Sequence, residues 1–179
     1  MNSIRPFKIP LAFLASLFFI ANCSSQQGKS PTDTAITENK NEKIMNNDSL
    51  VSFAQKYTQA WSSQTPGNVA AHFAEDGSLT VNNGTPAVGR IAIAKVAESF
   101  MTAFPDMVLR MDSLPTTEKG IEYHWTLSGT NTGPNGTGKK VRISGVEIWQ
   151  FDNQGLIKES KGSFDEEEYN RQLKDGVKY

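Results

Sequence analysis

The side chains that could carry catalytic chemistry are few, and they favour acid/base work by a carboxylate. The 179 residues contain two histidines, His72 and His124, which lie far apart and outside any cluster with the spacing of a metal site. The one cysteine is Cys23, near the N-terminus, and no serine stands in a nucleophile-elbow or phosphate-loop context. If the chain is an enzyme, this inventory predicts proton transfer without a metal or other cofactor.

Two large aromatic residues, Tyr123 and Trp125, lie two positions apart in a segment with strand character. They therefore share one face of the strand, together with Ile121 and Leu127. Buried Tyr and Trp need a partner for their polar atom, which a pocket can supply. Two interpretations stay open, in which this face is ordinary core or the aromatic wall of a ligand pocket. His124 points to the other face and is expected at the surface.

The elements that would position these residues can be outlined from periodicity and turn signals. Helices are predicted over 48–62, 66–73, 90–104 and 165–173, and strands over 78–83, 107–114, 121–130, 139–151 and 156–163. The loop "NTGPNGTG" (131–138) is too rich in Gly and Asn for a helix. The last four strands are separated by short turns and are expected to pair antiparallel in order. The pattern predicts an α+β domain over 48–173, in which a bent sheet wraps around helices.

The first 22 residues are typical of a secretory signal, because Arg5 and Lys8 precede an apolar run that is too short to span a bilayer. The run ends in Ile20-Ala21-Asn22-Cys23, which resembles the lipobox of bacterial lipoproteins. The resemblance implies that Cys23 is lipidated and anchors the protein in the bacterial cell envelope, at the outer membrane or the periplasmic face. Ordinary signal cleavage, with Cys23 left in a tail, is the alternative.

Residues 23–47 and the overall charge complete the outline. The 23–47 segment is polar and is predicted to be a disordered tether, and residues 174–179 form a short tail. The net charge is −1 for the whole chain and −3 without residues 1–22. Lys and Arg are scattered, so the chain lacks the basic footprint that nucleic-acid binding requires.

Three stretches carry a family resemblance. "YTQAWSSQTPGNVAAHFAEDGSL" and "AVGRIAIAKVAESFMTAFPDM" resemble the opening and the glycine-then-helix segment of the nuclear transport factor 2-like (NTF2-like) superfamily, which has a cone-shaped α+β fold. "GTNTGPNGTGKKVRISGVEIWQFDNQGLIKESKGSFDEEEYNRQL" is similar to its SnoaL-like polyketide cyclase and ester cyclase branch. That branch runs GTHTG, TGK, a GKI-E-W hairpin, an Asp and a terminal QL. The similarity covers nearly all of residues 50–173.

The resemblance implies that Asp165 is the general acid/base, moving a proton at a ligand carbon next to a carbonyl. Such a carboxyl needs a low-dielectric pocket that raises its pKa and donors that hold the enolate. The local sequence also allows a helix-capping role, because Ser163 to Glu166 and Asp165 to Glu168 both have the capping-box spacing. Both interpretations stay open at this point.

Two positions depart from the family pattern. Asn131 replaces the family histidine and cannot titrate near neutral pH. Lys161 replaces the aromatic residue expected beside the acid, and a lysine near Asp165 would lower the pKa of that carboxyl. Asp76 is a further carboxylate at a common position of the cone mouth, which a helix-terminating turn explains equally well.

The resemblance implies a cone pocket for a small hydrophobic ligand. The expected ligand-binding residues are four aromatic side chains and one amide: Tyr57, Trp61, Tyr123, Trp125 and Asn131. Such cones often form homodimers through the outer face of the sheet, which would carry Val146 and Ile148 here. Two functions therefore stand side by side. One is a lipid-anchored, cofactor-free cyclase- or isomerase-like enzyme, and the other is a non-catalytic domain that binds a ligand or a partner protein.

Overall fold

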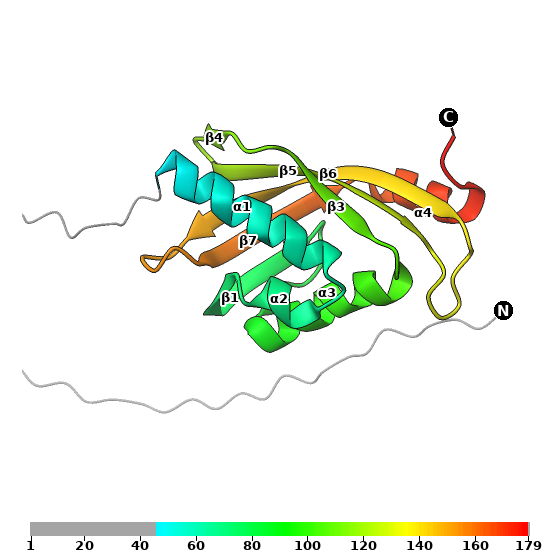
Figure 1. Cartoon of the computed structure of the whole chain (residues 1–179), viewed down its shortest axis with the longest axis horizontal. Helices are drawn as coiled ribbons and strands as arrows, with labels where there is room; N and C mark the ends of the chain where they lie inside the picture. Colours follow the sequence, from blue (N-terminus) through cyan, green and yellow to red (C-terminus); the bar gives the residue numbers. More distant parts are fainter. Residues whose placement is uncertain (1–45, 179) are drawn as a thin grey trace, which may run out of the picture. The chain divides into compact units, whose positions relative to one another are not determined.

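A seven-stranded sheet and four helices make up residues 46–178, the part of the chain that the computed structural model describes (Figure 1). In chain order the elements are α1 (Asn47–Ser62), α2 (Pro66–Ala70), β1 (Phe73–Val81), β2 (Ala87–Val88), α3 (Arg90–Ala103), β3 (Val108–Ser113), β4 (Thr116–Thr117), β5 (Gly120–Thr130), β6 (Lys140–Phe151), β7 (Ile157–Phe164) and α4 (Glu166–Asp175).

The strand order is β2-β1-β7-β6-β5-β3, with β4 added beside β5. Strands β3, β5, β6 and β7 pair antiparallel, as the sequence predicts, whereas β1 runs parallel to β7. The sheet is curved and does not close, and Figure 1 shows α1 lying across one of its faces. The predicted α+β class with a bent sheet is thereby confirmed.

The second predicted helix is shorter than its apolar pattern indicates, and the strand after it is longer. Pro66 starts α2 as its first residue, but the helix ends at Ala70. From Phe73 onward the chain is a β-strand, because Phe73 pairs with β7. Phe73 pairs with Ile157, and the Ile157 N–H donates to the carbonyl oxygen of His72 at 2.9 Å. Tertiary strand pairing thus overrides a local helical pattern.

The core lies between α1 and the inner face of the sheet. The side chains of Tyr123, Trp125 and Leu127 all point inward and are buried, as the alternation along β5 predicts. The rings of Tyr123 and Trp149 stack with centroids 4.6 Å apart, and Tyr57 of α1 meets both rings edge-on. His124 faces outward, as predicted, and its Nε2 lies 3.2 Å from a carboxylate oxygen of Glu122.

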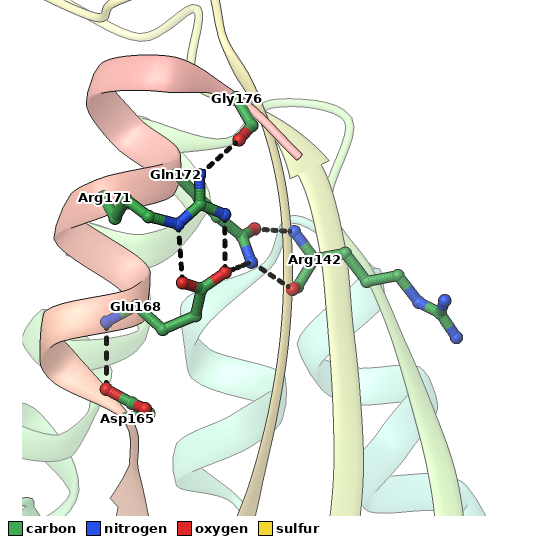
Figure 2. Close-up of polar contacts among 6 residues, drawn as sticks. All are labelled: Arg142, Asp165, Glu168, Arg171, Gln172 and Gly176. Atoms are coloured by element: carbon green, nitrogen blue, oxygen red, sulfur yellow. Dashed lines mark hydrogen bonds and ion pairs between the residues drawn. The ribbon is translucent and has the colours of Figure 1, made fainter. Parts of the chain in front are cut away.

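Helix α4 is fixed to β6 by the side chain of Gln172, which hydrogen-bonds the β6 backbone at a point that β7 does not reach. Pairing between β6 and β7 begins at Gly145 and Phe164, so the backbone of Arg142 lies beyond the end of β7. The Gln172 side chain covers this edge, as Figure 2 shows. Its Oε1 accepts from the Arg142 N–H at 2.6 Å, and its Nε2 donates to the Arg142 carbonyl oxygen at 2.9 Å. Gln172, the glutamine of the terminal QL pattern, is only 5% exposed and serves as a surrogate strand.

The predicted signal, Cys23 and the tether lie outside the described residues. Within residues 46–178, none of the helices is both long and apolar enough to span a membrane. Val146 and Ile148 are partly exposed on the outer face of β6, and the homodimer stays a prediction.

Candidate functional site

Glu147 is a buried carboxylate in the middle of the sheet. It lies on β6 between Tyr123 of β5 and Gly162 of β7, and it is 6% exposed. Its neighbours along the inner face of β6 are apolar, including Ile143 and Trp149. A carboxylate rarely occupies such a position unless its oxygens have partners.

Three neutral donors converge on one oxygen of Glu147. Its Oε2 accepts from the Tyr57 hydroxyl at 3.0 Å, from the Trp149 Nε1–H at 3.0 Å and from the Ser160 hydroxyl at 2.7 Å. Burial raises the pKa of Glu147 above its ordinary value of 4.5, and the three hydrogen bonds act in the opposite direction. Burial and the nearby Glu147 charge also raise the pKa of Tyr57 well above 10, so its hydroxyl stays a donor.

The other oxygen of Glu147, Oε1, accepts no hydrogen bond from the described residues. Among the described residues, each hydrogen bond to this carboxylate ends on Oε2. Because Oε2 already accepts three hydrogens, a proton taken up by Glu147 is placed on Oε1. A carboxyl with a raised pKa and one free oxygen is suited to general acid/base catalysis.

Glu147 lines a partly open cavity between α1, α3 and the sheet. The cavity offers about 50 Å³ to the centres of water-sized groups. Its walls are apolar apart from the Glu147 carboxylate, and they are formed by Trp61, Leu79, Val81, Phe100, Leu109, Trp125, Leu127, Glu147, Gly162 and Phe164. The arrangement is that of a small hydrophobic pocket with one titratable group in its wall.

Two of the cavity residues, Trp61 and Trp125, carry buried indole N–H groups without a hydrogen-bond partner among the described residues. Trp61 Nε1 lies close enough to the Tyr57 hydroxyl to favour its ionised form, but the geometry is not that of a hydrogen bond. An unsatisfied buried donor costs about 1–3 kcal/mol. Both nitrogens are covered by the surrounding atoms, so neither N–H group is exposed to the cavity.

The structure brings together four of the five predicted ligand-binding residues. Tyr57 bonds Glu147, and Trp61 and Trp125 line the cavity. Tyr57 and Tyr123 are not among the residues that line the cavity, and the Tyr123 hydroxyl shares a hydrogen bond of 2.7 Å with Thr58.

Asn131, the fifth predicted residue, lies elsewhere, in the β5–β6 loop. Its Nδ2 donates to the Ala103 carbonyl oxygen at 3.1 Å and its Oδ1 accepts from the Thr137 N–H at 2.8 Å. Asn131 is not among the residues that line the cavity. In this structure it holds the loop against the end of α3.

Asp165, the predicted acid/base, is the exposed N-cap of α4. Its Oδ1 accepts from the Glu168 N–H at 2.9 Å, as Figure 2 shows, and it is not among the residues that line the cavity. Lys161 pairs with Glu159 at 3.0 Å, so the expected lysine beside Asp165 is engaged by another carboxylate. The helix-capping interpretation describes the geometry of Asp165.

Asp76 is likewise exposed, and its carboxylate pairs with Lys158 at 2.5 Å. Hydrogen bonding and charge attraction from this lysine lower the pKa of Asp76. For the residues that the structure describes, His, Cys, Asp and Glu side chains form no cluster of three or more that could hold a metal.

Glu147 is not among the site residues predicted from the sequence. A signal was present in "VRISGVEIWQF" (141–151), where every second residue from Val141 to Phe151 is apolar or Gly except Glu147. A strand with this alternation buries that set of positions, so a charged residue in phase with them is a candidate for function.

Comparison with known proteins agrees with this architecture. The SnoaL-like polyketide cyclase family model matches residues 51–173. No curated protein shows significant similarity to the chain. A SnoaL-like polyketide cyclase from Jannaschia sp. CCS1 has a similar structure, with a TM-score of 0.61, 10% identity and coverage of 71% of this chain and 92% of that chain.

Two other proteins have similar structures. One is an epoxide hydrolase/cyclase-like enzyme of pyran ring formation in the polyether salinomycin, with a TM-score of 0.57, 16% identity and coverage of 69% of this chain and 95% of that chain. The other is a protein of ketosteroid isomerase-like fold from Catenulispora acidiphila in complex with trimethylamine, with a TM-score of 0.60, 12% identity and coverage of 68% and 92%. At these identities the structures share the fold, and the match of the family model over 51–173 shows that the chain belongs to the SnoaL-like polyketide cyclase family.

Proposed function

We propose that the chain binds a small hydrophobic carbonyl compound beside Glu147 and moves a proton at the carbon next to the carbonyl, without a cofactor. The observation that carries this proposal is the placement of Glu147. One of its oxygens is held by three neutral donors, and the carboxylate stands in the wall of an apolar cavity. Membership of a polyketide cyclase family supports the same chemistry.

The proton transfer balances with Glu147 alone. The ionised Oε1 takes the proton as the C–H bond breaks, and the electron pair moves to the carbonyl oxygen to give an enolate. The protonated carboxyl then returns the proton to the same carbon or to another one. Tyr57, Trp149 and Ser160 keep Oε2 in place during both steps because they stay hydrogen-bonded to it.

The test is exchange of the α-hydrogens of cyclopentanone in D₂O, followed by ¹H NMR. We expect Glu147→Gln to lower the protein-catalysed exchange rate by at least about 100-fold. Asp165→Asn is the matched control, because Asn keeps the cap and the site is remote from the cavity; its rate should equal that of the native chain. Loss of exchange in Asp165→Asn with retention in Glu147→Gln would contradict the proposal.

The pH dependence provides a second readout. The base must be ionised, so the exchange rate rises as pH increases through the pKa of Glu147. Burial places this pKa above 4.5, so the acid limb of the profile should lie above that value. An acid limb at or below 4.5 would show that another group is the base.

A binding domain without turnover is the second candidate. The observation that favours it is that the cavity, as described, presents a single titratable group, so a second acid that could protonate the ligand oxygen is missing from its wall. Cyclopentanone binding without catalysed exchange in the native chain would support this alternative.

The proposed location is the bacterial cell envelope, with a lipid on Cys23. The support is the sequence Ile20-Ala21-Asn22-Cys23 after an apolar run. Stable anchoring requires two acyl chains or a second membrane-binding element. Cys23→Ser should move the protein from the membrane fraction to the soluble fraction of the envelope, and a variant that stays in the membrane fraction would contradict the anchor.

A further inference from the structure

One inward-facing position of β7, beside Glu147, carries no side chain. Side chains alternate along the strand, so Ser160, Gly162 and Phe164 share the face that lies toward the core. The Ser160 hydroxyl donates to Glu147 at 2.7 Å, and Phe164 lines the cavity. Gly162 lies between them and also lines the cavity, so the wall at this point is the bare backbone of β7.

The sheet register places Gly162 between two other residues of the cavity wall. It pairs with Val81 of β1 on one side and with Glu147 of β6 on the other. Residues that pair across a sheet direct their side chains to the same face. A ligand group that lies over Gly162 is therefore flanked by the apolar Val81 side chain and by the Glu147 carboxylate.

Neither the backbone conformation nor a severe clash requires glycine at position 162. Gly162 is not among the residues with positive φ, the region that favours glycine. A Cβ atom there would lie 3.3 Å from the Thr80 carbonyl oxygen and 3.4 Å from Cγ of Glu147, so small shifts would accommodate alanine. Gly145 differs, because its Cβ atom would lie 2.4 Å from Cζ2 of Trp125. A strand glycine without such a cause is typical of a place that a ligand approaches closely.

One carboxylate oxygen of Glu147 is accessible from the cavity. Within residues 46–178, the side-chain N and O atoms that are both covered and without a hydrogen bond are the indole nitrogens of Trp61 and Trp125. Oε1 of Glu147 accepts no hydrogen bond from these residues and is not one of the covered atoms. The space over Gly162 therefore adjoins an open oxygen of the proposed base.

We propose that Gly162 determines the substrate specificity of the Glu147 site, and that the ring of a cyclic ketone lies over its backbone, between Val81 and Glu147. A side chain at position 162 would occupy this space, so it would hinder a cyclic ketone more than a smaller acyclic one. The inference rests on the proposed function for the identity of the base, and it adds the residue that selects the substrate.

The test compares cyclopentanone with acetone in the native chain and in Gly162→Ala. Rates of α-hydrogen exchange in D₂O and dissociation constants from NMR titration are measured for both ketones. The added methyl group should lower the rate and the affinity for cyclopentanone roughly tenfold. The values for acetone should change by less than about twofold, which also shows that Glu147 is intact. Gly162→Val fills more of the space and should enlarge the difference between the ketones.

Gly129→Ala is the matched control. Gly129 is a strand glycine of β5 whose Cβ atom would lie 3.2 Å from Cβ of Phe104 and 3.3 Å from Oδ1 of Asp106, but it is not among the residues that line the cavity. This variant should treat both ketones as the native chain does. The two alanine variants should unfold at similar urea concentrations, so a difference in ligand selectivity would not arise from stability.

Equal losses for the two ketones in Gly162→Ala, or a native ratio of cyclopentanone to acetone in both Gly162 variants, would overturn the inference and leave the proposed function in place. Cyclopentanone binding without exchange in the native chain would instead contradict the proposed function. The ratio of the two dissociation constants then still decides the role of Gly162. A roughly tenfold change in that ratio supports the role, and an unchanged ratio overturns it.

Discussion

Glu147 and Glu168 are two carboxylates that each accept several hydrogen bonds, yet their environments shift their pKa values in opposite directions. Glu147 on β6 is buried and accepts from three neutral groups. Glu168 on α4 is partly exposed and accepts from two guanidinium nitrogens of Arg171, at 2.6 and 2.7 Å, and from Gln172 at 2.8 Å (Figure 2). The pKa of Glu147 is raised mainly by burial, whereas hydrogen bonds from Arg171 and Gln172 lower that of Glu168 to about 2.

The difference shows that the charge of the donors and access to water matter more than the number of hydrogen bonds. Neutral donors orient Glu147 but do not offset its desolvation. A cation beside an exposed carboxylate stabilises the charge and keeps it ionised, as the Glu168–Arg171 pair does within α4. The first arrangement favours proton exchange and the second favours structure.

Replacing a neutral donor to Glu147 should have the largest effect on stability. Tyr57→Phe removes a buried hydrogen bond to a charged group, which costs about 1.5–3 kcal/mol. The raised pKa of Glu147 makes folding less favourable as pH rises from 4.5 through that pKa, and the lost donor should steepen this decline. Urea unfolding at pH 4.5 and pH 8 measures the cost, which should be greater at pH 8.

Tyr123→Phe is the control for that prediction. It also loses a buried hydroxyl, but that hydroxyl bonds Thr58 rather than Glu147. Its cost should be the same at both pH values. An equal pH dependence in the two variants would show that the Tyr57 effect does not act through Glu147.

Removing the hydrogen bonds from Gln172 to the backbone of β6 should have the next largest effect on stability. Gln172→Leu leaves the Arg142 N–H and carbonyl without their partner, and water at this edge can replace part of the loss. We expect a decrease of about 1–2 kcal/mol in the free energy of unfolding, measured by urea denaturation. Asn170→Ala, at an exposed position of the same helix, should stay within about 0.5 kcal/mol of the native chain.

Removing the Arg171 guanidinium beside Glu168 should mainly change the pKa of the Glu168 carboxyl. In Arg171→Gln the pKa of Glu168 should rise from about 2 towards its ordinary value of 4.5, as measured by NMR of the carboxyl carbon. In the native chain this lowered pKa contributes stability above pH 4.5 that is lost as pH falls through about 2, so the variant should lose that pH dependence. A pKa that remains near 2 would assign the shift to Gln172.

The smallest effect is expected at Asp165. Asp165→Asn keeps an oxygen that accepts from the Glu168 N–H, so the free energy of unfolding should change by less than about 0.5 kcal/mol. Asp165→Ala should cost about 1 kcal/mol by the same urea assay. A large loss in the Asn variant would show that Asp165 has a role beyond capping.

Most of the fold could be predicted from local patterns, and the exceptions have one cause. Helix α3 and strands β5, β6 and β7 begin and end within one or two residues of their predicted bounds. The error near Phe73 came from a partner that is remote in sequence, because β7 draws that residue into the sheet. Periodicity contains no information about which distant strand will pair.

Only part of the site could be predicted, because some of its contacts join elements that are remote in sequence. Trp61 and Trp125 follow from helix and strand periodicity, since the core-facing positions that they occupy also line the cavity. Tyr57 follows from the same periodicity and bonds Glu147. The acid/base role of Asp165 was predicted from the family resemblance. The capping-box spacing around Asp165 already indicated a helix cap. The convergence of Tyr57, Trp149 and Ser160 on one oxygen joins α1, β6 and β7, and only the folded chain brings these elements together.

The parallel pairing of β1 with β7 also constrains the order of folding. Leu79 pairs with Ser160, so this part of the sheet closes between residues about 80 positions apart. The hairpins from β5 to β7 can form from near neighbours, whereas β1 must wait until β7 exists. Ser160, which holds Glu147, lies on this last strand. A nascent chain can therefore assemble the aromatic face of β5 first, and it acquires its complete carboxylate site only when the C-terminal strand has been synthesised.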